Sequence, residues 1–336
     1  MKKGLTGFMK GVNLGGWMSH RNYALEHLET FITEDDIRRI AGWETDHVRI
    51  PVDYNLFEDE NRKEGTGYRV LDRGLRWCRK NSLNVIIDLH QAAGFSYEPT
   101  FAESGLFNSE AYQQRFYDLW ESFAERYGNE PDHIAFELLN EITEPSFIPA
   151  WNMMVEKVLK VIRKHAPETR ILVGSYHNNS IDALPALQLP DDENLILNFH
   201  CYDPIAFTHQ NAYWMPDTGP HYNLKYPCTK DEYMEIQSVR PGFVNYKDLS
   251  DHPVFDADYF IKRFAPAAAL AEKLRLPLYC GEYGVIDRSD EESAARWHAD
   301  IHTAFEYYGI GRAAWSYKQM DFGIIDRPLL ERNIKF

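Results

Sequence analysis

Short apolar runs alternate with longer amphipathic segments along this chain, and the alternation constrains the fold more than any other feature. Eight runs rich in β-branched and aromatic residues are predicted as strands, at 7–14, 47–52, 84–90, 134–141, 171–174, 195–202, 278–282 and 313–317. Helix signals occupy the segments between them, such as Ser109 before an amphipathic run that Gly128 closes. Eight strand-helix repeats predict an α/β fold, a (β/α)8 TIM barrel. The alternative is an open doubly wound sheet, but no G-x-G-x-x-G fingerprint follows the first strand.

One connection between neighbouring predicted strands is much longer than the rest. It joins the strands that begin at Leu195 and Leu278, and a helix over 256–273 can supply the usual crossover within it. The excess therefore falls at 203–255, directly after the carboxyl end of the sixth strand, where loops build the active face of a barrel. We expect a single domain over 1–336, in which 203–255 forms an inserted subdomain over the active face.

The charge and composition of the chain exclude several classes of partner. Its formal net charge is -15, so it repels nucleic acids and anionic membrane surfaces. No apolar run approaches the roughly 18 residues that a membrane-spanning helix needs. Hydrophobic residues make up 44% of the chain, which is enough to bury a large core. We expect a monomer that acts on a neutral substrate and has neither nucleic acid nor membrane as a partner.

The cysteines and the first residues indicate where the protein works. Four cysteines lack any C-x-x-C spacing: Cys78, Cys201, Cys228 and Cys280. They predict buried free thiols, which favour a reducing compartment, rather than disulfides or a zinc site. The apolar stretch at 4–9 is too short for a signal peptide and ends at Lys10. We expect a cytoplasmic protein, or a secreted one if a leader has been removed.

Polar and aromatic side chains stand at the last inward-facing positions of six predicted strands. Residues two apart along a strand face the same way, and those at its carboxyl end project into the mouth of a barrel. The converging side chains are Arg49, His90, Asn140, Glu141, His200, Tyr202, Glu282 and Trp315. Ordinary solvation of strand ends does not place such groups on six strands at once. Glu137 has the parity of Glu141 but lies about 13 Å deeper, at about 3.3 Å per residue, too far to touch a substrate.

Two of these side chains, Glu141 and Glu282, have the chemistry to hydrolyse a glycosidic bond. The reaction needs one carboxyl group that protonates the leaving oxygen and one carboxylate that faces the anomeric carbon. Arg49 and the Tyr202 hydroxyl are expected to lower the pKa of Glu282, because a cation and a hydrogen-bond donor both favour the ionised form. A less polar pocket near a second carboxylate is expected to raise the pKa of Glu141.

Seven motifs stand at the predicted strand ends, and together they resemble one known family. The motifs are GVNLGGW at 11–17, HVRIP at 47–51, DLH at 88–90, LLNE at 138–141, HCY at 200–202, GEYG at 281–284 and AAWSY at 313–317. They resemble glycoside hydrolase family 5, the cellulase family, over nearly the whole chain, and are similar to small bacterial endoglucanases without a secretion signal. The resemblance implies that Glu141 is the acid/base and Glu282 the nucleophile. The substrate-binding residues it implies are Arg49, His90, Asn140, His200, Tyr202 and Trp315.

The expected activity is a retaining hydrolysis of internal β-1,4-glucosidic bonds in cellulose-type or mixed-linkage β-glucans and their oligosaccharides. Neither a metal nor an organic cofactor is expected. His20, which follows the first predicted strand, is expected to line the cleft, and Trp214 of the insert is expected to stack on sugar rings. A β-mannanase or an exo-acting β-glucosidase on the same scaffold is the alternative, because loops decide the choice of substrate.

Two other classes of barrel protein are disfavoured. A metal-dependent amidohydrolase would carry H-x-H at the first strand, and a non-catalytic sugar-binding barrel would have no use for both glutamates. His298 and His302 have the i, i+4 spacing of a zinc-ligand pair, but Ala299 stands where zinc proteases carry a glutamate base. The two histidines are therefore predicted to lie on a solvated helix face.

Overall fold

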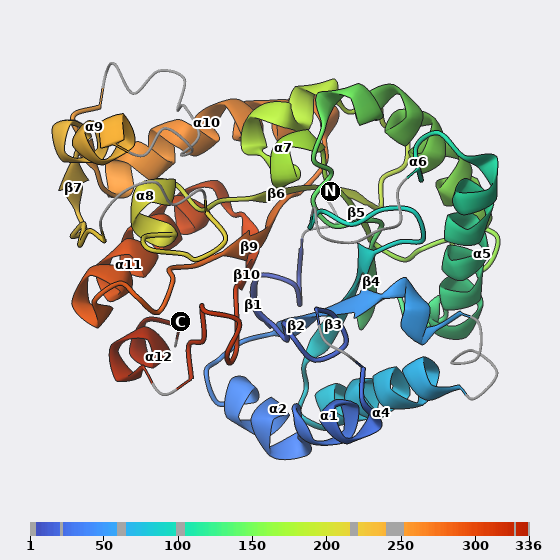
Figure 1. Ribbon diagram of the computed structural model, residues 1–336. Coiled ribbons are helices and arrows are strands. Elements are labelled where there is room, and N and C mark those ends of the chain that lie inside the picture. Colours follow the sequence, from blue (N-terminus) through green and yellow to red (C-terminus); the bar gives the residue numbers. More distant parts are fainter. Residues whose placement is uncertain are drawn as a thin grey trace.

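The fold is a closed barrel, seen in a computed structural model that describes residues 5–20, 23–58, 65–98, 105–215, 221–239, 252–325 and 327–334. Within these residues, eight parallel strands pair in the order β1-β10-β9-β6-β5-β4-β3-β2, and helices surround them (Figure 1). The barrel strands are β1 Lys10–Asn13, β2 His47–Asp53, β3 Asn84–Gln91, β4 Ile134–Glu137, β5 Ile171–Val173, β6 Leu195–His200, β9 Leu278–Tyr283 and β10 Gly311–Ala314. The predicted (β/α)8 barrel is confirmed.

Helices follow the strands, and the helix at Glu110–Tyr127 begins directly after Ser109 and ends before Gly128, as predicted. The α-helices are α1 Leu25–Thr30, α2 Glu34–Ala41, α4 Thr66–Lys80, α5 Glu110–Tyr127, α6 Ile148–Ile162, α7 Tyr176–Asn179, α8 Ile205–Thr208, α9 Lys230–Val239, α10 Ala257–Leu274, α11 Glu291–Tyr308 and α12 Pro328–Ile334. Short 3-10 turns are η1 Tyr54–Leu56, η2 Pro145–Phe147 and η3 Ile181–Ala186. Thr33 and Asp36 form a reciprocal capping box at the start of α2. None of the described helices is long and apolar enough to cross a membrane.

The barrel interior is layered, and the layers explain why polar groups gather at one end. The lowest layer is apolar and consists of Leu5, Phe8, Ile86, Ala135, Leu172, Ile196, Tyr279 and Ala313. Side chains two positions further along each strand form the next layer. On β3, β4 and β6 these are Asp88, Glu137 and Asn198, all fully buried. The apolar layer therefore closes the end of the barrel where the strands begin. The polar layer lies nearer the end where the strands finish.

Several strands end earlier than the sequence pattern predicts. The strand predicted at 134–141 ends at Glu137, where its ladder with β5 stops opposite Leu172. Asn140 and Glu141 therefore lie on the loop after β4. Tyr202 likewise follows the end of β6, so these side chains are aimed by loop conformation rather than by strand alternation.

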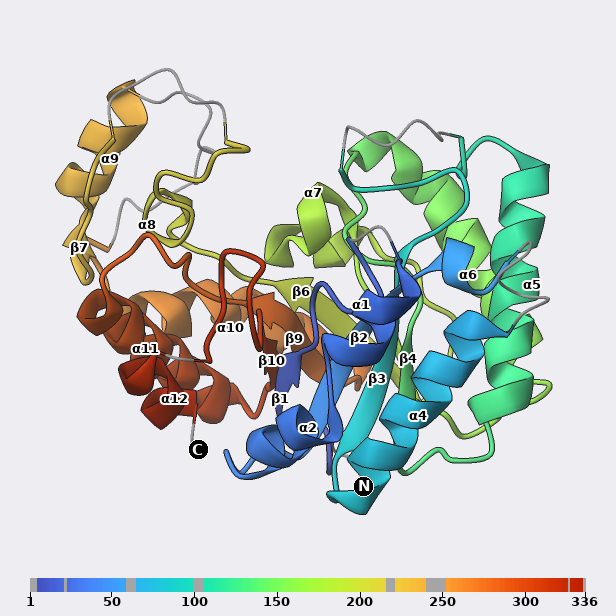
Figure 2. The same cartoon turned by 60° about the horizontal axis from the view of Figure 1, so that its bottom comes forward.

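The long connection after β6 contains α8, the two-stranded antiparallel pair of β7 (Cys228–Thr229) and β8 (Val254–Phe255), and α9. Figure 2 shows α8, α9 and β7 standing above α10 and α11 on one side of the barrel. Tyr233 is buried against Phe255, with ring centroids 5.2 Å apart, and Phe255 packs on Tyr259 of α10 at 4.8 Å. Some aromatic residues of this segment thus form a local core. Residues 216–220 and 240–251 of the predicted insert lie outside the described residues.

The prediction that His298 and His302 lie on a solvated face is wrong. Both are buried on the face of α11 that packs against β9, and the hydroxyl of Tyr283 lies 2.9 Å from His302 Nε2. Large apolar neighbours on the same helix, such as Trp297 and Phe305, place this face against the barrel. Burial lowers the pKa of His298 to about 3, so its ring is neutral. The prediction for the four cysteines is confirmed, since all are free and buried.

Candidate active site

Glu282 reaches the barrel interior through a shift in strand register. On β9, Tyr279 lies in the apolar layer and Gly281 faces inward, where a Cβ atom would lie 2.9 Å from His200 Nε2. Strict alternation would therefore point Glu282 outward. The pairing of β9 with β6 and with β10 shifts register beside this residue, and such an irregularity re-aims a side chain. Glu282 lies opposite His200 as a result.

Arg49 on β2 is fully buried and connects the polar layer to the mouth. Its Nε and Nη2 donate to both carboxylate oxygens of Glu137, at 2.7 and 2.8 Å. Its Nη1 donates to Glu282 Oε1 at 2.8 Å, and its Nη2 lies 3.0 Å from Asp88 Oδ2. Nη2 also donates to Asn140 Oδ1 at 2.9 Å. One guanidinium thus binds side chains from β3, β4, β9 and the loop after β4.

Glu141 stands beside Glu282 on a loop with an uncommon backbone. Its φ is 42°, in the left-handed region that costs a non-glycine residue roughly 1–2 kcal/mol. Asn178, which also has a positive φ of 56°, donates from Nδ2 to Glu141 Oε2 at 3.0 Å. Strain of this kind persists where surrounding contacts fix the backbone, and it is common at functional sites.

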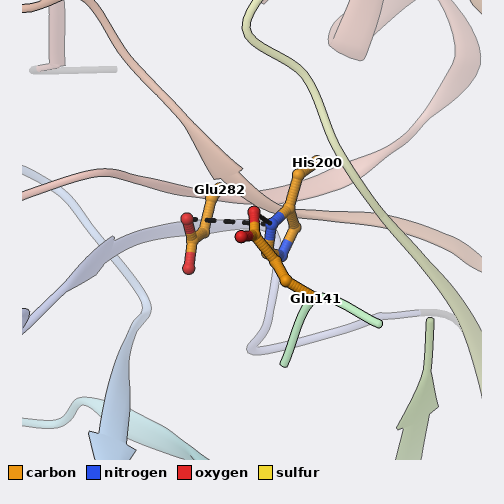
Figure 3. Close-up of side chains that lie close together, drawn as sticks. All are labelled: Glu141, His200 and Glu282. Carbon is orange, nitrogen blue, oxygen red and sulfur yellow. Dashed lines mark hydrogen bonds and ion pairs between the residues drawn. The ribbon is translucent and has the colours of Figure 1, made fainter. Parts of the chain in front are cut away.

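His200 contacts both glutamates, and the dashed lines in Figure 3 run from its imidazole toward their carboxylates. Its Nδ1 is 2.8 Å from Glu141 Oε1 and 3.7 Å from Glu282 Oε2. Carboxylate oxygens of the two glutamates and the imidazole nitrogen all lie within 4.8 Å of one another. Burial lowers the pKa of His200 to about 4, so the ring is neutral at pH 7. Asn179 Nδ2 lies 3.4 Å from the other ring nitrogen, which it approaches as a donor.

The pKa of Glu141 agrees with the prediction, whereas that of Glu282 does not. Burial raises the pKa of Glu141 to about 7. Tyr202 donates its hydroxyl to Glu282 Oε2 at 3.0 Å and Arg49 binds Oε1, as expected. Burial nevertheless raises the pKa of Glu282 to about 7, so the predicted lowering is wrong. The loss of water outweighs the cation, because Arg49 is shared with Glu137 and Asp88.

An aromatic wall flanks the glutamates on the side of β3 and β10. Trp315 stacks on His90, with ring centroids 5.7 Å apart and planes inclined by 4°. His90 Nδ1 lies 2.6 Å from Asp88 Oδ2, and burial holds the pKa of His90 well below its usual value, so the neutral ring donates from Nδ1. The ring of His20 meets that of His90 edge-on, with centroids 4.6 Å apart. The Nε2 atom of His20 lies 3.4 Å from Glu98 Oε1. His20 therefore joins the wall.

Trp214 lies further out, on the segment after α8. It is 44% exposed, and its ring centroid is 6.4 Å from that of Phe322 and 6.2 Å from that of His209. Both of these rings contact Tyr202, at 5.7 and 5.0 Å. Tyr202 in turn donates to Glu282. A continuous row of aromatic groups thus runs from Glu282 to an exposed tryptophan.

The structure adds functional neighbours that the sequence analysis missed or set aside. Asp88 and Glu137 bind Arg49, and Asn13 Oδ1 accepts from Arg49 Nη1 at 2.8 Å. The parity of Asp88 with His90 in the DLH motif is a signal that could have found it. Asn178 and Asn179 had no such signal, because they reach the site through a turn after β5 with left-handed backbone.

Fold and site together define the class of protein: a (β/α)8 barrel glycoside hydrolase. Residues 8–321 match the family described as cellulase (glycosyl hydrolase family 5), and the chain belongs to this family. It is 43% identical to cellodextrinase A of Ruminococcus flavefaciens over 307 residues, which are 91% of this chain and 84% of that protein. It is 40% identical to endoglucanase C of Acetivibrio thermocellus over 328 residues, 95% and 94% of the two chains. The solved structure of a hyperthermophilic endo-β-1,4-glucanase shares the fold, with a TM-score of 0.76 at 24% identity and 98% of both chains covered.

Proposed function

We propose that this protein is a retaining endo-β-1,4-glucanase that cleaves cellulose-type or mixed-linkage β-glucans and their oligosaccharides. The observation that carries the proposal is the pair of buried glutamates, whose carboxylate oxygens lie within 4.8 Å of each other. Retaining glycosidases hold their two carboxyl groups about 5–5.5 Å apart, whereas inverting enzymes leave about 6.5–9.5 Å for a water molecule. The endoglucanase and cellodextrinase relatives support the choice of glucan.

Glu282 is the proposed nucleophile. Burial raises the pKa of both glutamates, and two carboxylates this close do not ionise together easily, so one of them holds a proton more firmly than a free glutamate does. Glu282 accepts from the Arg49 cation and the Tyr202 hydroxyl, whereas Glu141 accepts from the neutral amide of Asn178. The cation favours the negative charge on Glu282 and leaves the proton on Glu141. Glu282 can then attack the anomeric carbon and form a glycosyl ester.

Glu141 is the proposed acid/base. It protonates the glycosidic oxygen as the bond to the leaving group breaks, and so becomes a carboxylate. That carboxylate then removes a proton from water, which attacks the glycosyl ester and releases Glu282. The neutral His200, within 2.8 Å of Glu141, keeps this carboxyl group oriented without adding a positive charge that would hold it ionised.

The remaining side chains bind the sugar. Asn140 accepts from Arg49 through Oδ1, which directs its amide nitrogen as a donor toward a sugar hydroxyl, a contact that can strengthen in the transition state. His90 donates from Nδ1 to Asp88 and therefore offers Nε2 as an acceptor. Trp315 supplies an apolar face for the reacting ring, and His20 extends the wall beside it.

We propose that the segment 203–255 is an inserted subdomain that adds sugar-binding surface next to the cleft. Its Trp214 ends the row of rings that starts at Tyr202, and it is exposed enough to stack on a sugar. An outer aromatic of this kind would bind a further unit of a long glucan. Mannan or exo-acting specificity on the same scaffold is not favoured by the named relatives.

We propose that the enzyme acts as a monomer in the cytoplasm, without a metal or organic cofactor. The neutral sugar substrate suits a chain of net charge -15, and four buried free thiols suit a reducing compartment. Light scattering measures the oligomeric state, and fractionation of the native host tests the location.

The test of the function is a substrate and product profile of the purified enzyme. Carboxymethyl cellulose and mixed-linkage glucan should lose viscosity quickly, because internal bonds are cut. Proton NMR should detect the β anomer before mutarotation. Faster cleavage of mannan or xylan, release of glucose from chain ends alone, or an initial α anomer would contradict the proposal.

A further inference from the structure

Three side chains of the candidate active site have the donor atoms of a transition-metal site. Glu141, His200 and Glu282 offer one imidazole nitrogen and two carboxylate oxygens, all within 4.8 Å of one another (Figure 3). Their side chains are 12%, 1% and 7% exposed, so the donor atoms are largely shielded from water. Three donors of this kind with an open fourth position are a common arrangement for Zn²⁺.

We propose that Zn²⁺ binds to Glu141, His200 and Glu282 and thereby inhibits the enzyme. Binding would remove both catalytic carboxylates from reaction at once. The inhibition rests on the proposed function of the two glutamates, whereas the binding itself does not.

The two donor distances from His200 are close to those in a zinc site, and the two carboxylates would close around the ion from within 4.8 Å of each other. Ligands about 2.1 Å from Zn²⁺ in tetrahedral geometry lie about 3.4 Å from one another. His200 Nδ1 is 2.8 Å from Glu141 Oε1 and 3.7 Å from Glu282 Oε2, on either side of this value. Glu282 keeps its other oxygen, Oε1, on Arg49. A dication also matches the local charge, because Arg49 alone is shared among Glu282, Glu137 and Asp88.

Asn179 provides the second observation. For Nδ1 of His200 to bind a metal, Nε2 must carry the ring proton and needs an acceptor. Asn179 is fully buried, its Nδ2 lies 3.4 Å from Nε2, and its Oδ1 has no hydrogen-bond partner among the described residues. A half turn of this amide brings Oδ1 to Nε2, and the two amide orientations have nearly the same shape. Zinc binding would therefore satisfy an oxygen that is otherwise without a partner.

Isothermal titration calorimetry of the intact enzyme with zinc chloride tests the binding. One Zn²⁺ per chain is expected, with Mg²⁺ giving no heat because it avoids imidazole nitrogen. Asn179→Leu should weaken zinc affinity about 10- to 100-fold, because it removes the acceptor for the ring proton of His200. Glu282→Gln and His200→Asn each remove a ligand and should weaken zinc affinity at least as much. Circular dichroism checks that each variant is folded. If His200→Asn does not fold, Glu282→Gln is the ligand variant that tests the site.

A surface cluster of the same residue types supplies the matched control. His165, in the turn after α6, has its Nε2 3.5 Å from Glu121 Oε1 and 3.7 Å from Glu125 Oε1, two side chains of α5 that are 38% and 60% exposed. His165→Gln should leave zinc affinity unchanged. Binding that His165→Gln abolishes, or that Glu282→Gln leaves intact, would overturn the proposed metal site.

Glucan hydrolysis measured in the same solutions separates the two proposals. Zinc should compete with cello-oligosaccharide, and EDTA should restore full activity. An absence of zinc binding, with activity on glucan intact, refutes the metal site alone. Zinc bound through these residues without inhibition would instead contradict both the inhibition and the proposed roles of the glutamates.

Discussion

Glu137 shows how a residue that is too deep to touch substrate can still govern the reaction. Its two oxygens hold Nε and Nη2 of Arg49, and Nη1 of the same guanidinium holds Glu282. Asn198 Nδ2 donates to Glu137 Oε1 at 2.8 Å and fixes the carboxylate in turn. The position of the proposed nucleophile therefore depends on a carboxylate one layer below it.

Glu137→Gln should lower kcat on the order of a hundredfold with little change in KM, because small displacements of reacting groups cost about that much. Glu306→Gln is the matched control, since Glu306 binds Arg312 at 2.9 Å and is largely exposed. Steady-state kinetics on an aryl cellobioside measures both. A Glu137→Gln enzyme with normal kcat would remove Glu137 from the positioning of the site.

Glu141 should make stability depend on pH. Its pKa is 4.5 when unperturbed and about 7 in the fold, so the folded state holds its proton more tightly than the unfolded state. The stability that this proton supplies is complete below pH 4.5 and is lost as pH rises to about 7. Glu141→Gln cannot ionise, and its Tm should exceed that of the parent at pH 8, with a smaller gap at pH 5. Thermal unfolding at both pH values measures this. Equal gaps would mean that burial does not raise the pKa.

At the scale of elements, the sequence predicts which strands exist better than where they end. All eight predicted strands are present in order, because apolar periodicity reports burial directly. Strand ends depend on the neighbouring strand, which no local pattern contains, and β4 accordingly ends before Asn140 and Glu141. The register shift that turns Glu282 inward depends on the pairing of β9 with β6 and β10. The left-handed turn that brings Asn178 to Glu141 depends on backbone hydrogen bonds to the loop after β4.

Two neighbouring residues, Tyr213 and Trp214, can test whether the segment after β6 binds sugar. Trp214 touches the aromatic row that leads to Glu282, whereas the adjacent Tyr213 is 77% exposed and lies beneath Arg288. Trp214→Ala should raise KM for long glucans about tenfold, which matches the free energy of one aromatic stacking contact. It should change KM for a small aryl glycoside little. Tyr213→Ala should change neither. Equal effects of the two substitutions would make this segment a structural appendage.

At the scale of the whole molecule, the sequence contains the inventory of the site but not its electrostatics. Arg49, His90 and His200 converge as predicted, because a closed parallel barrel sends every strand end to one mouth, and Glu282 joins them through the register shift in β9. The predicted direction of the pKa shift of Glu282 is wrong, because that shift depends on how deeply the fold buries the carboxylate and on how many groups share Arg49. Neither quantity is a property of a motif. His298 and His302 were placed on the wrong face for a similar reason, because a polar residue can be buried by its neighbours.

The most direct test of the account is to trap the covalent intermediate that it requires. In a 2-deoxy-2-fluoro cellobioside the fluorine slows both the formation and the hydrolysis of the glycosyl ester. A good leaving group restores the rate of formation, so the ester accumulates. Mass spectrometry of the peptides should find one fluorinated cellobiosyl group on Glu282, with loss of activity in proportion to labelling. Label on Glu141, or full turnover with inversion and no labelled peptide, would contradict a nucleophilic Glu282.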